Sequence, residues 1–211
     1  MSYTNTQIAE LAEKILAAPQ KGRRKVVAIA GPPASGKSTL AEQLAEFLTD
    51  HGTMSVVVPM DGYHLDNGIL EKRGLLTRKG APETFDALGF LRLVSELSSG
   101  KHMFYPTFDR QRDLAVSAAG EIGGCIECAL VEGNYLLLDQ PVWRELLHHW
   151  DLSIKLDVPI EVLRHRLVKR WQAHGLNDRQ ALERAEGNDL QNAASILALS
   201  ISADITLRSI D

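Results

Sequence analysis

Residues 26–39 read Val26-Val27-Ala28-Ile29-Ala30-Gly31-Pro32-Pro33-Ala34-Ser35-Gly36-Lys37-Ser38-Thr39, an apolar run that leads into a glycine-containing loop. From Gly31 to Ser38 the loop matches the pattern G-x-x-x-x-G-K-[S/T] at every fixed position. Glycines allow backbone N–H groups to converge on phosphate oxygens, and the free amides at the start of the next helix attract the same anion. The stretch therefore predicts a strand, a nucleotide-binding loop over residues 31–39, and a helix.

Two side chains of this loop indicate its ligand. Lys37 supplies a cation between the β- and γ-phosphates, and the Ser38 hydroxyl can hold Mg²⁺, so ATP with Mg²⁺ is expected. The chain lacks the Asn-Lys-x-Asp motif of a GTPase, and the apolar run 126–131 leads into Glu132 without the Asp-Glu pair of a large ATPase. These absences favour a small-molecule kinase that phosphorylates an alcohol group. A nucleotide-dependent regulatory switch is the alternative from a different class.

Apolar runs of strand length alternate with helical patterns along the chain. The runs lie at 26–30, 55–59, 126–131, 152–158 and 203–207, and the helical patterns at 6–17, 37–49, 85–98, 141–149, 159–172 and 188–199. This alternation predicts an α/β fold in one domain over residues 1–211, with a central, mostly parallel sheet between layers of helices. Residues 101–120 break the alternation and suggest a small inserted hairpin.

The composition excludes several classes of protein. The chain has 211 residues and a formal net charge of −4, so it lacks the basic balance of a nucleic-acid-binding protein. No apolar run approaches the ~18 residues of a membrane span. The polar first residues show no secretory signal, so a cytoplasmic protein is expected. The expected partner is a small-molecule substrate, and a homodimer stays open.

Two short motifs are interpreted as structural. The pair Cys125 and Cys128 forms a C-x-x-C, but no second pair at metal-ligand spacing completes a zinc site, which favours two free thiols near a strand. Residues 21–25 form a basic connector that we interpret as a solvated loop, with contact to a phosphate as the alternative.

Acidic residues follow two of the apolar runs. Asp61 comes directly after residues 56–60, and Glu132 after residues 126–131. Ligands of open parallel sheets bind outside the carboxyl ends of the strands, so both carboxylates are candidates for the site. We interpret Asp61 as the general base, with a plain Asp-Gly turn as the alternative. Glu132 is expected to hold metal-bound water or to contact the substrate, unless it is simply an exposed acid at a strand end.

The helical pattern at 160–171 carries Arg166 and Arg170 four residues apart. Like charges at that spacing repel, and a bound anion would relieve the repulsion. The pattern therefore suggests a lid over about residues 166–187 whose arginines close on the transferring phosphoryl group, with Arg179 and Arg184 as later members. A solvated basic face is the alternative.

Five motifs in this order resemble the phosphoribulokinase/uridine kinase family of P-loop kinases, which includes bacterial pantothenate kinase. They are Gly31–Ser38, Asp61-Gly62-Tyr63-His64, residues 80–86, Tyr105-Pro-Thr-Phe-Asp109 and Val131-Glu-Gly-Asn-Tyr135. The chain is most similar to the bacterial branch of fructose-transport kinases and nucleoside or nucleotide kinase-like proteins. The resemblance implies a P-loop NTPase fold, ATP with Mg²⁺, and phosphorylation of a hydroxyl. It also places Asp61 at the catalytic aspartate, Asp86 and Asp109 among the substrate contacts, and Arg166 and Arg170 in the lid.

The segment after Pro106 bears on the acceptor. Uridine kinases carry a Tyr and a His there, whereas this chain has Phe108 and no following His. Asp109, Arg110 and Arg112 would suit a polyol or an anion, unless they form a solvated loop. Together with Asp86, these residues favour a sugar such as fructose over a nucleoside or a pantothenate-like acid. Tyr63 and His64 are further candidate substrate contacts.

Overall fold

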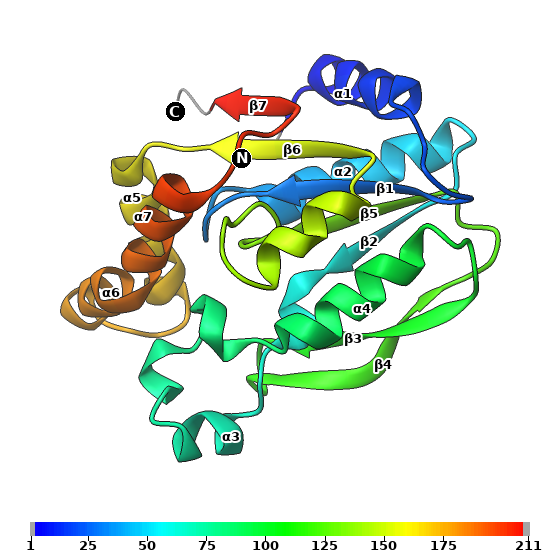
Figure 1. Ribbon diagram of the computed structural model, residues 1–211. Helices are drawn as coiled ribbons and strands as arrows, with labels where there is room; N and C mark the ends of the chain where they lie inside the picture. The colour runs from blue at the N-terminus through cyan, green and yellow to red at the C-terminus, as the bar shows by residue number, and fades with distance from the viewer. Residues whose placement is uncertain (1–2, 209–211) are drawn as a thin grey trace.

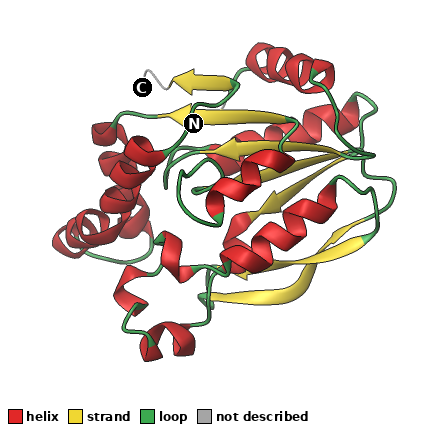
Figure 2. Ribbon diagram, in the orientation of Figure 1, coloured by secondary structure: helices red, strands yellow, loops and turns green. Residues whose placement is uncertain are grey.

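The apolar runs of the sequence form a five-stranded sheet in which every paired neighbour is parallel (Figures 1 and 2). The computed structural model describes residues 3–208. The strand order is β2 (Ser55–Pro59), β5 (Cys128–Gly133), β1 (Lys25–Ala30), β6 (Leu152–Asp157) and β7 (Ile205–Arg208). Parallel neighbours need crossover connections, which the intervening helices supply, so the predicted α/β fold is confirmed.

Alternate side chains of β1 enter two separate cores. Val26 and Ala28 pack in a cluster with α4 (Ala87–Leu97) and the 3-10 helix Trp143–His149. Val27 and Ile29 pack in a second cluster with α1 (Asn5–Ala17) and α2 (Lys37–Asp50). Successive side chains of a strand point to opposite faces, so a strand that is apolar at every position is covered on both sides. This gives the three layers that the sequence predicts.

The break in the alternation is a separate two-stranded hairpin. Strand β3 (Met103–Asp109) pairs antiparallel with β4 (Leu114–Ile122), which confirms the predicted insertion. The hairpin is held against the main sheet by the hydroxyl of Tyr105, which donates to the carbonyl oxygen of Val57 at 2.9 Å. Its tip, residues 110–113, therefore lies near the carboxyl end of β2.

The chain after β6 builds a helical lid. It comprises α5 (Ile160–Ala173), α6 (Asp178–Arg184), a π-helical turn (Ala185–Asp189) and α7 (Leu190–Leu199). Residues of α5, the π-helical turn and α7 share a small apolar cluster, which Val158 joins and against which Ala34 of the phosphate loop packs. Figure 1 shows them together at the end of the sheet toward which β6 points. We use the name lid for residues 160–199, which extend beyond the predicted bounds of about 166–187 at both ends; closure of this segment over a ligand stays a prediction.

Some local predictions were wrong. The helix expected at 141–149 is a 3-10 helix from Trp143 to His149, and the strand expected to begin at Ile126 begins at Cys128. Two short helices, α3 (Asn67–Lys72) and α6, were not predicted as separate elements. A helix of one or two turns offers too few residues for an apolar period to show, and packing rather than propensity holds it.

The basic connector is also not a solvated loop throughout. The guanidinium of Arg24 is fully buried and donates to the carbonyl oxygens of Leu97, Lys101, Gly123 and Ile126. Lys25 Nζ donates to three carbonyl oxygens at the end of α1. Loop and helix ends leave main-chain carbonyls without partners, and these two cations satisfy them.

The cysteine pair and the length of the helices bear on two classes of protein, zinc-binding and membrane-spanning. Cys125 is exposed and Cys128 is buried, both as free thiols, and no group of three potential metal ligands occurs among the described residues. None of the described helices is long and apolar enough to cross a membrane.

Candidate active site

The loop between β1 and α2 has the backbone shape that phosphate binding requires. Ala34 and Gly36 both adopt left-handed conformations, with φ of 62° and 96°. The N–H of Ser35 donates to the carbonyl of Pro32 at 3.1 Å and closes the turn. Because φ changes sign along the loop, successive N–H groups turn toward one concave side, which is the geometry of an anion-binding nest.

This loop also leaves donors without partners. Gly36 caps α2 without a side-chain hydrogen bond to the first turn, so the amides there remain available. The Ser35 hydroxyl is buried and has no hydrogen-bond partner among residues 3–208. A Cβ added to Gly31 would lie 2.7 Å from that hydroxyl oxygen, so the loop has no room for a side chain at this position. Free amides, an orphaned hydroxyl and a helix N-terminus together fit a phosphate group.

Glu132 is the penultimate residue of β5 and lies beside this loop. It is only 5 % exposed, and burial raises the pKa of its carboxyl group, while Lys37 and a hydrogen bond from the Ser38 side chain act in the opposite direction. Glu132 and Ser38 thus bring a carboxylate and a hydroxyl oxygen together beside the loop. Mg²⁺ prefers such oxygen ligands, so these residues fit the ion.

Asp61 lies in a 3-10 turn, Met60–Tyr63, that directly follows β2. Its Oδ2 accepts from Nη2 of Arg110 at 3.0 Å, and its side chain is 22 % exposed. Arg110 comes from the hairpin tip, so this ion pair joins the hairpin to the carboxyl end of the main sheet. No local sequence pattern indicates the pairing, because the two residues are 49 positions apart.

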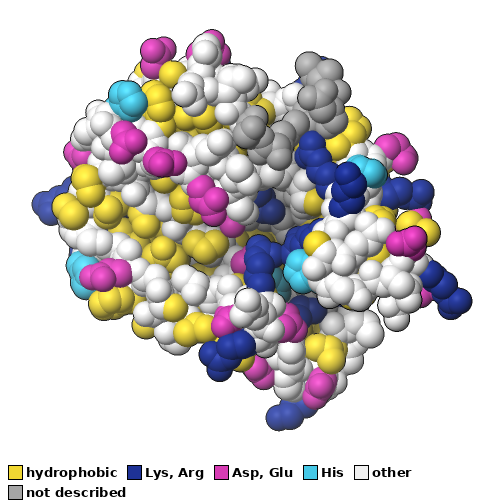
Figure 3. Space-filling view, turned by 180° about the vertical axis from the view of Figure 1, so that it is seen from behind, with side chains coloured by type: hydrophobic (Ala, Val, Ile, Leu, Met, Phe, Trp, Pro, Cys, Tyr) yellow, Lys and Arg dark blue, Asp and Glu magenta, His cyan; other side chains and the backbone are white. Residues whose placement is uncertain are grey.

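A cavity of about 380 Å³ joins the loop, the turn, the hairpin tip and the lid. Its lining residues are Pro33, Lys37, Asp61, His64, Asn67, Leu76, Lys79, Gly80, Phe108, Arg110, Asp113, Asn134, Arg170, Trp171, Arg184, Asp189 and Asn192. Figure 3 shows the molecule from behind the view of Figure 1. Lys and Arg side chains gather there beside a hollow, on the half of the face that carries the lid. Lys37 and Asp61, predicted separately from the sequence, thus face one cavity.

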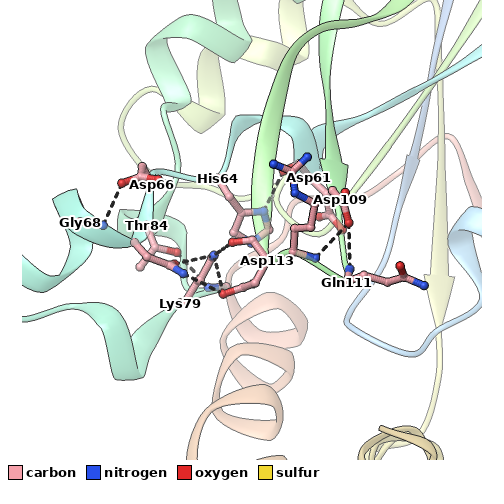
Figure 4. Close-up of polar contacts among 12 residues, drawn as sticks. Asp61, His64, Asp66, Gly68, Lys79, Thr84, Asp109, Gln111 and Asp113 are labelled. Carbon is pink, nitrogen blue, oxygen red and sulfur yellow. Dashed lines mark hydrogen bonds and ion pairs between the residues drawn. The ribbon is translucent and has the colours of Figure 1, made fainter.

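His64 is held in a defined orientation within this cavity. Its ring lies between those of Phe85 and Phe108, with centroids 4.0 and 4.7 Å away. Nδ1 lies 2.8 Å from the carbonyl oxygen of Asp61, which can only accept, so Nδ1 carries the proton (Figure 4). Burial lowers the pKa of His64, and Nε2 is therefore a hydrogen-bond acceptor at neutral pH.

The lid contributes cations and an aromatic ring. Arg170 lines the cavity, and its pKa is lowered by burial first and by Arg110 second. Arg166 does not line the cavity; its Nη1 donates to the carbonyl oxygen of Ala34 at 3.4 Å, against the phosphate loop. Trp171 Nε1 donates to Asp189 at 2.7 Å, and Arg184 lies over the ring.

Several predicted site residues lie outside the cavity lining. Asp86 caps α4 by accepting from the N–H of Gly89, and Asp109 accepts from the N–H groups of Gln111 and Arg112. Tyr63 packs edge-on against Phe90, and burial raises the pKa of its phenol to about 12. Arg112 is exposed. Arg179 pairs with Glu183 on the exposed surface of α6. Contact of these residues with a substrate stays a prediction.

The structure also adds lining residues that the sequence reasoning did not single out. They are Asn67, Leu76, Lys79, Asp113, Asn134, Trp171, Asp189 and Asn192. Asn134 stands inside a motif quoted from the sequence, three residues after Val131, and that position was the available signal. The others carry no motif, and only folding brings them together.

Comparison with known proteins places the chain among kinases. A structure from Silicibacter sp. TM1040, described as a "putative fructose transport system kinase", is 51 % identical with a TM-score of 0.91, covering 95 % of this chain and 98 % of that one. "Putative uridine kinase C227.14" of Schizosaccharomyces pombe is 30 % identical over 204 residues, covering 89 % of this chain and 84 % of its own length. The chain belongs to the phosphoribulokinase/uridine kinase family of P-loop kinases.

Two further comparisons name no kinase. "Uncharacterized protein YggC" of Escherichia coli (strain K12) is 36 % identical over 186 residues, covering 87 % of this chain and 77 % of its length. The family model "Methylmalonyl Co-A mutase-associated GTPase MeaB" matches residues 2–69, less than half of the chain and the part that contains the phosphate loop. As a member of the phosphoribulokinase/uridine kinase family, the protein is a small-molecule kinase.

Proposed function

We propose that the protein transfers the γ-phosphoryl group of ATP, with Mg²⁺, to a hydroxyl of a small polyol, most simply a sugar such as fructose. The observation that carries this proposal is the cavity in which Lys37 of the phosphate loop and Asp61 at the end of β2 face the same space. A phosphoryl donor on one side and an acceptor hydroxyl on the other would meet there.

The donor side is formed by residues 31–39. Their amides and the Ser35 hydroxyl would hold the phosphates, with Lys37 as the cation. Ser38 and Glu132 would hold Mg²⁺, which when bound neutralises part of the charge on the phosphate oxygens. Arg166, against the loop, and Arg170, in the cavity, would hold the transferring group from the lid side.

The transfer itself needs one proton acceptor. Asp61 would accept the proton of the acceptor hydroxyl as the bond from that oxygen to the γ-phosphorus forms and the bond from phosphorus to the ADP oxygen breaks. Arg110 occupies Oδ2 of Asp61, which leaves Oδ1 for the hydroxyl. Little covalent chemistry is required of the protein, and positioning supplies most of the acceleration.

The acceptor side is rich in groups that accept hydrogen bonds. Among residues 3–208, no hydrogen bond engages His64 Nε2 or Asp61 Oδ1, and Asn134 Oδ1 is buried without a partner. Lys79, by contrast, has its three N–H donors engaged by Asn67 and Asp113. A ring of hydroxyls supplies donors to such groups. The similarity to the Silicibacter protein supports the same acceptor class.

ADP production tests the proposal across acceptor classes. We expect fructose or another ketose to raise the rate more than uridine, cytidine or pantothenate does, and Lys37→Ala to lower the stimulated rate by at least ~100-fold while the circular dichroism spectrum is unchanged. A nucleoside or pantothenate that surpasses every sugar would overturn the sugar acceptor and leave the kinase. Stimulation by a protein partner alone would favour the regulatory switch.

A further inference from the structure

Residues 78–80 cross the space between the hairpin tip and the lid, and we call them the strap. Lys79 and Gly80 line the cavity. Gly80 adopts a left-handed backbone with φ of 101°, and its carbonyl oxygen accepts from the hydroxyl of the buried Tyr135 at 2.5 Å. The strap is thus fixed to the core of the main sheet at one end.

On the acceptor side, Lys79 fixes the strap to the hairpin. Its Nζ donates to Oδ1 of Asn67 at 2.7 Å and to the carbonyl oxygen of Asp113 at 2.8 Å, and it forms an ion pair with Oδ2 of Asp113 at 2.9 Å (Figure 4). All three Nζ donors are used in this way. A shift of the strap therefore shifts the hairpin tip, which carries Arg110 to Asp61.

On the lid side, Asn188 fixes the strap to the π-helical turn. Its Nδ2 donates to the carbonyl oxygen of Lys79 at 2.8 Å, and its Oδ1 accepts from Nη1 of Arg78 at 3.1 Å. Asn188 is only 2 % exposed. Arg78 also donates to Gln191 at 3.2 Å. Breaking these bonds would leave buried polar atoms without partners, so lid and strap are expected to move together.

The π-helical turn also places the neighbouring residue in the cavity. Asp189 lines it and accepts from Trp171 of α5, so one turn of the lid contacts both the strap and the helix that carries Arg166 and Arg170. Since Arg166 contacts the phosphate loop, an ATP molecule on that loop would bias the position of the lid. The hydrogen bonds of Asn188 to Lys79 and Arg78 would then shift the strap, and with it the acceptor side of the cavity.

We propose that Asn188 is a positioning residue that couples nucleotide binding at the phosphate loop to the acceptor side of the cavity, through the main chain of Lys79. The proposal rests on the proposed binding of ATP. Binding of the nucleotide then orders residues 78–80. Because coupling between two binding sites is reciprocal, an acceptor that contacts the strap raises the affinity for the nucleotide by the same factor by which the nucleotide raises the affinity for that acceptor.

Hydrogen exchange of the full chain tests this coupling without knowledge of the acceptor. The probe is a non-hydrolysable ATP analogue with Mg²⁺, and the amides of residues 31–39 report its binding. In the wild type we expect the analogue to slow exchange at 78–80 by about tenfold. In Asn188→Ala the slowing should persist at 31–39 and disappear at 78–80. Ser195→Ala, on the exposed side of the same lid, is the matched control and should behave as the wild type.

A second variant guards against misfolding of Asn188→Ala. Arg78→Ala removes two bonds to the lid from a side chain that is 37 % exposed and should reduce the slowing at 78–80 in part. Slowing at 31–39 without slowing at 78–80 in the wild type overturns the coupling and leaves ATP binding intact. Equal slowing of exchange at residues 78–80 in the wild type and in Asn188→Ala would also overturn the coupling through Asn188 and leave ATP binding intact. No slowing at 31–39 contradicts the proposed function itself, and the coupling with it.

Discussion

The two carboxylate oxygens of Asp61 have different surroundings, because one forms an ion pair and the other is left for the cavity that Asp61 lines. Oδ2 accepts a hydrogen bond from Arg110, and no residue within 3–208 forms a hydrogen bond with Oδ1. Glu132 differs, because it is nearly enclosed and lies beside Lys37 and Ser38. A group that takes a proton from the acceptor must reach the cavity, whereas a metal ligand must lie beside the phosphate loop. These different environments assign the two acids different roles in the proposed reaction.

Substitution of the two acids should separate those roles. Asp61→Asn removes the proton acceptor and keeps the shape, so kcat should fall by roughly 100-fold or more with ATP binding nearly unchanged. Glu132→Gln should instead raise the Mg²⁺ concentration needed for half-maximal rate. Steady-state kinetics over a Mg²⁺ series measures both. Full kcat in Asp61→Asn would move the proton acceptor elsewhere, with Glu132 as the next candidate.

Arg110 should affect kcat rather than nucleotide binding. Arg110→Ala releases Oδ2 of Asp61, and we expect kcat to fall about tenfold while the KM for ATP stays within about twofold. Arg110→Lys should restore most of the rate, because the pair uses a single N–H donor and a point charge can replace it. Arg144→Ala is the control, since it breaks an Arg–Asp pair outside the cavity lining whose arginine is as exposed as Arg110, 53 % against 52 %. An equal loss in both alanine variants would contradict this role.

The position of Asp61 depends on how closely two elements approach. The 3-10 turn after β2 and strand β3 of the hairpin meet at Gly62, where an added Cβ would lie 1.9 Å from the carbonyl oxygen of Pro106. A main-chain oxygen cannot rotate away as a flexible side chain can. The absence of a side chain at Gly62 therefore lets the hairpin pack against the turn and brings Arg110 within reach of Asp61.

Gly62→Ala should separate these two elements. We expect a loss of about 1–3 kcal/mol in the free energy of unfolding, measured by denaturant titration, because overpacking forces the backbone to shift. The kcat should fall as well, since Asp61 is the adjacent residue. Gly124→Ala is the matched control: no atom lies within 4 Å of its added Cβ, and the stability change should be within about 0.5 kcal/mol. Equal free energies of unfolding in the two variants would contradict this prediction and show that the hairpin can shift away from residue 62 without loss of stability.

At the scale of the molecule, apolar packing among residues 3–208 is divided into three clusters. Two cover the faces of the sheet, and the third lies within the lid. The cavity lies where the sheet, the hairpin and the lid meet, so groups buried around it belong to no single core. Protonation of such a group changes the stability of the fold because its pKa differs between the folded and the unfolded chain.

His64 makes this dependence measurable. Its pKa is lowered in the folded protein, chiefly by burial, so the unfolded chain binds the proton more readily. The stability that neutral His64 contributes is complete above the unfolded pKa of about 6.5 and is lost as pH falls toward the folded pKa. Lowering the pH from about 7.5 to about 5.5 should therefore reduce Tm more in the wild type than in His64→Gln. An identical reduction in both would exclude His64 as the source.

The phosphate loop, the strands and the two strand-end acids could all be predicted from the sequence. Gly31–Ser38, the continuous apolar run before it and the positions of Asp61 and Glu132 are local patterns. Each follows from bonds and packing within a few residues or from the rule that parallel strands end together. Arg24 shows the limit, because its charge predicted solvent exposure and four carbonyl oxygens from distant segments hold it in the core.

Only the tertiary structure decided which residues share the cavity. Arg110 reaches Asp61 across 49 positions, and Asn188 reaches Lys79 across 109. The same structure turned Asp86 and Asp109 toward nearby main-chain N–H groups, outside the cavity lining. Polar side chains take the partners that folding brings within about 3 Å, and a single sequence records their chemistry but not those distances. The sequence by itself thus determined the fold class and the phosphate-binding loop, and the packing of hairpin and lid decided how the acceptor side is built.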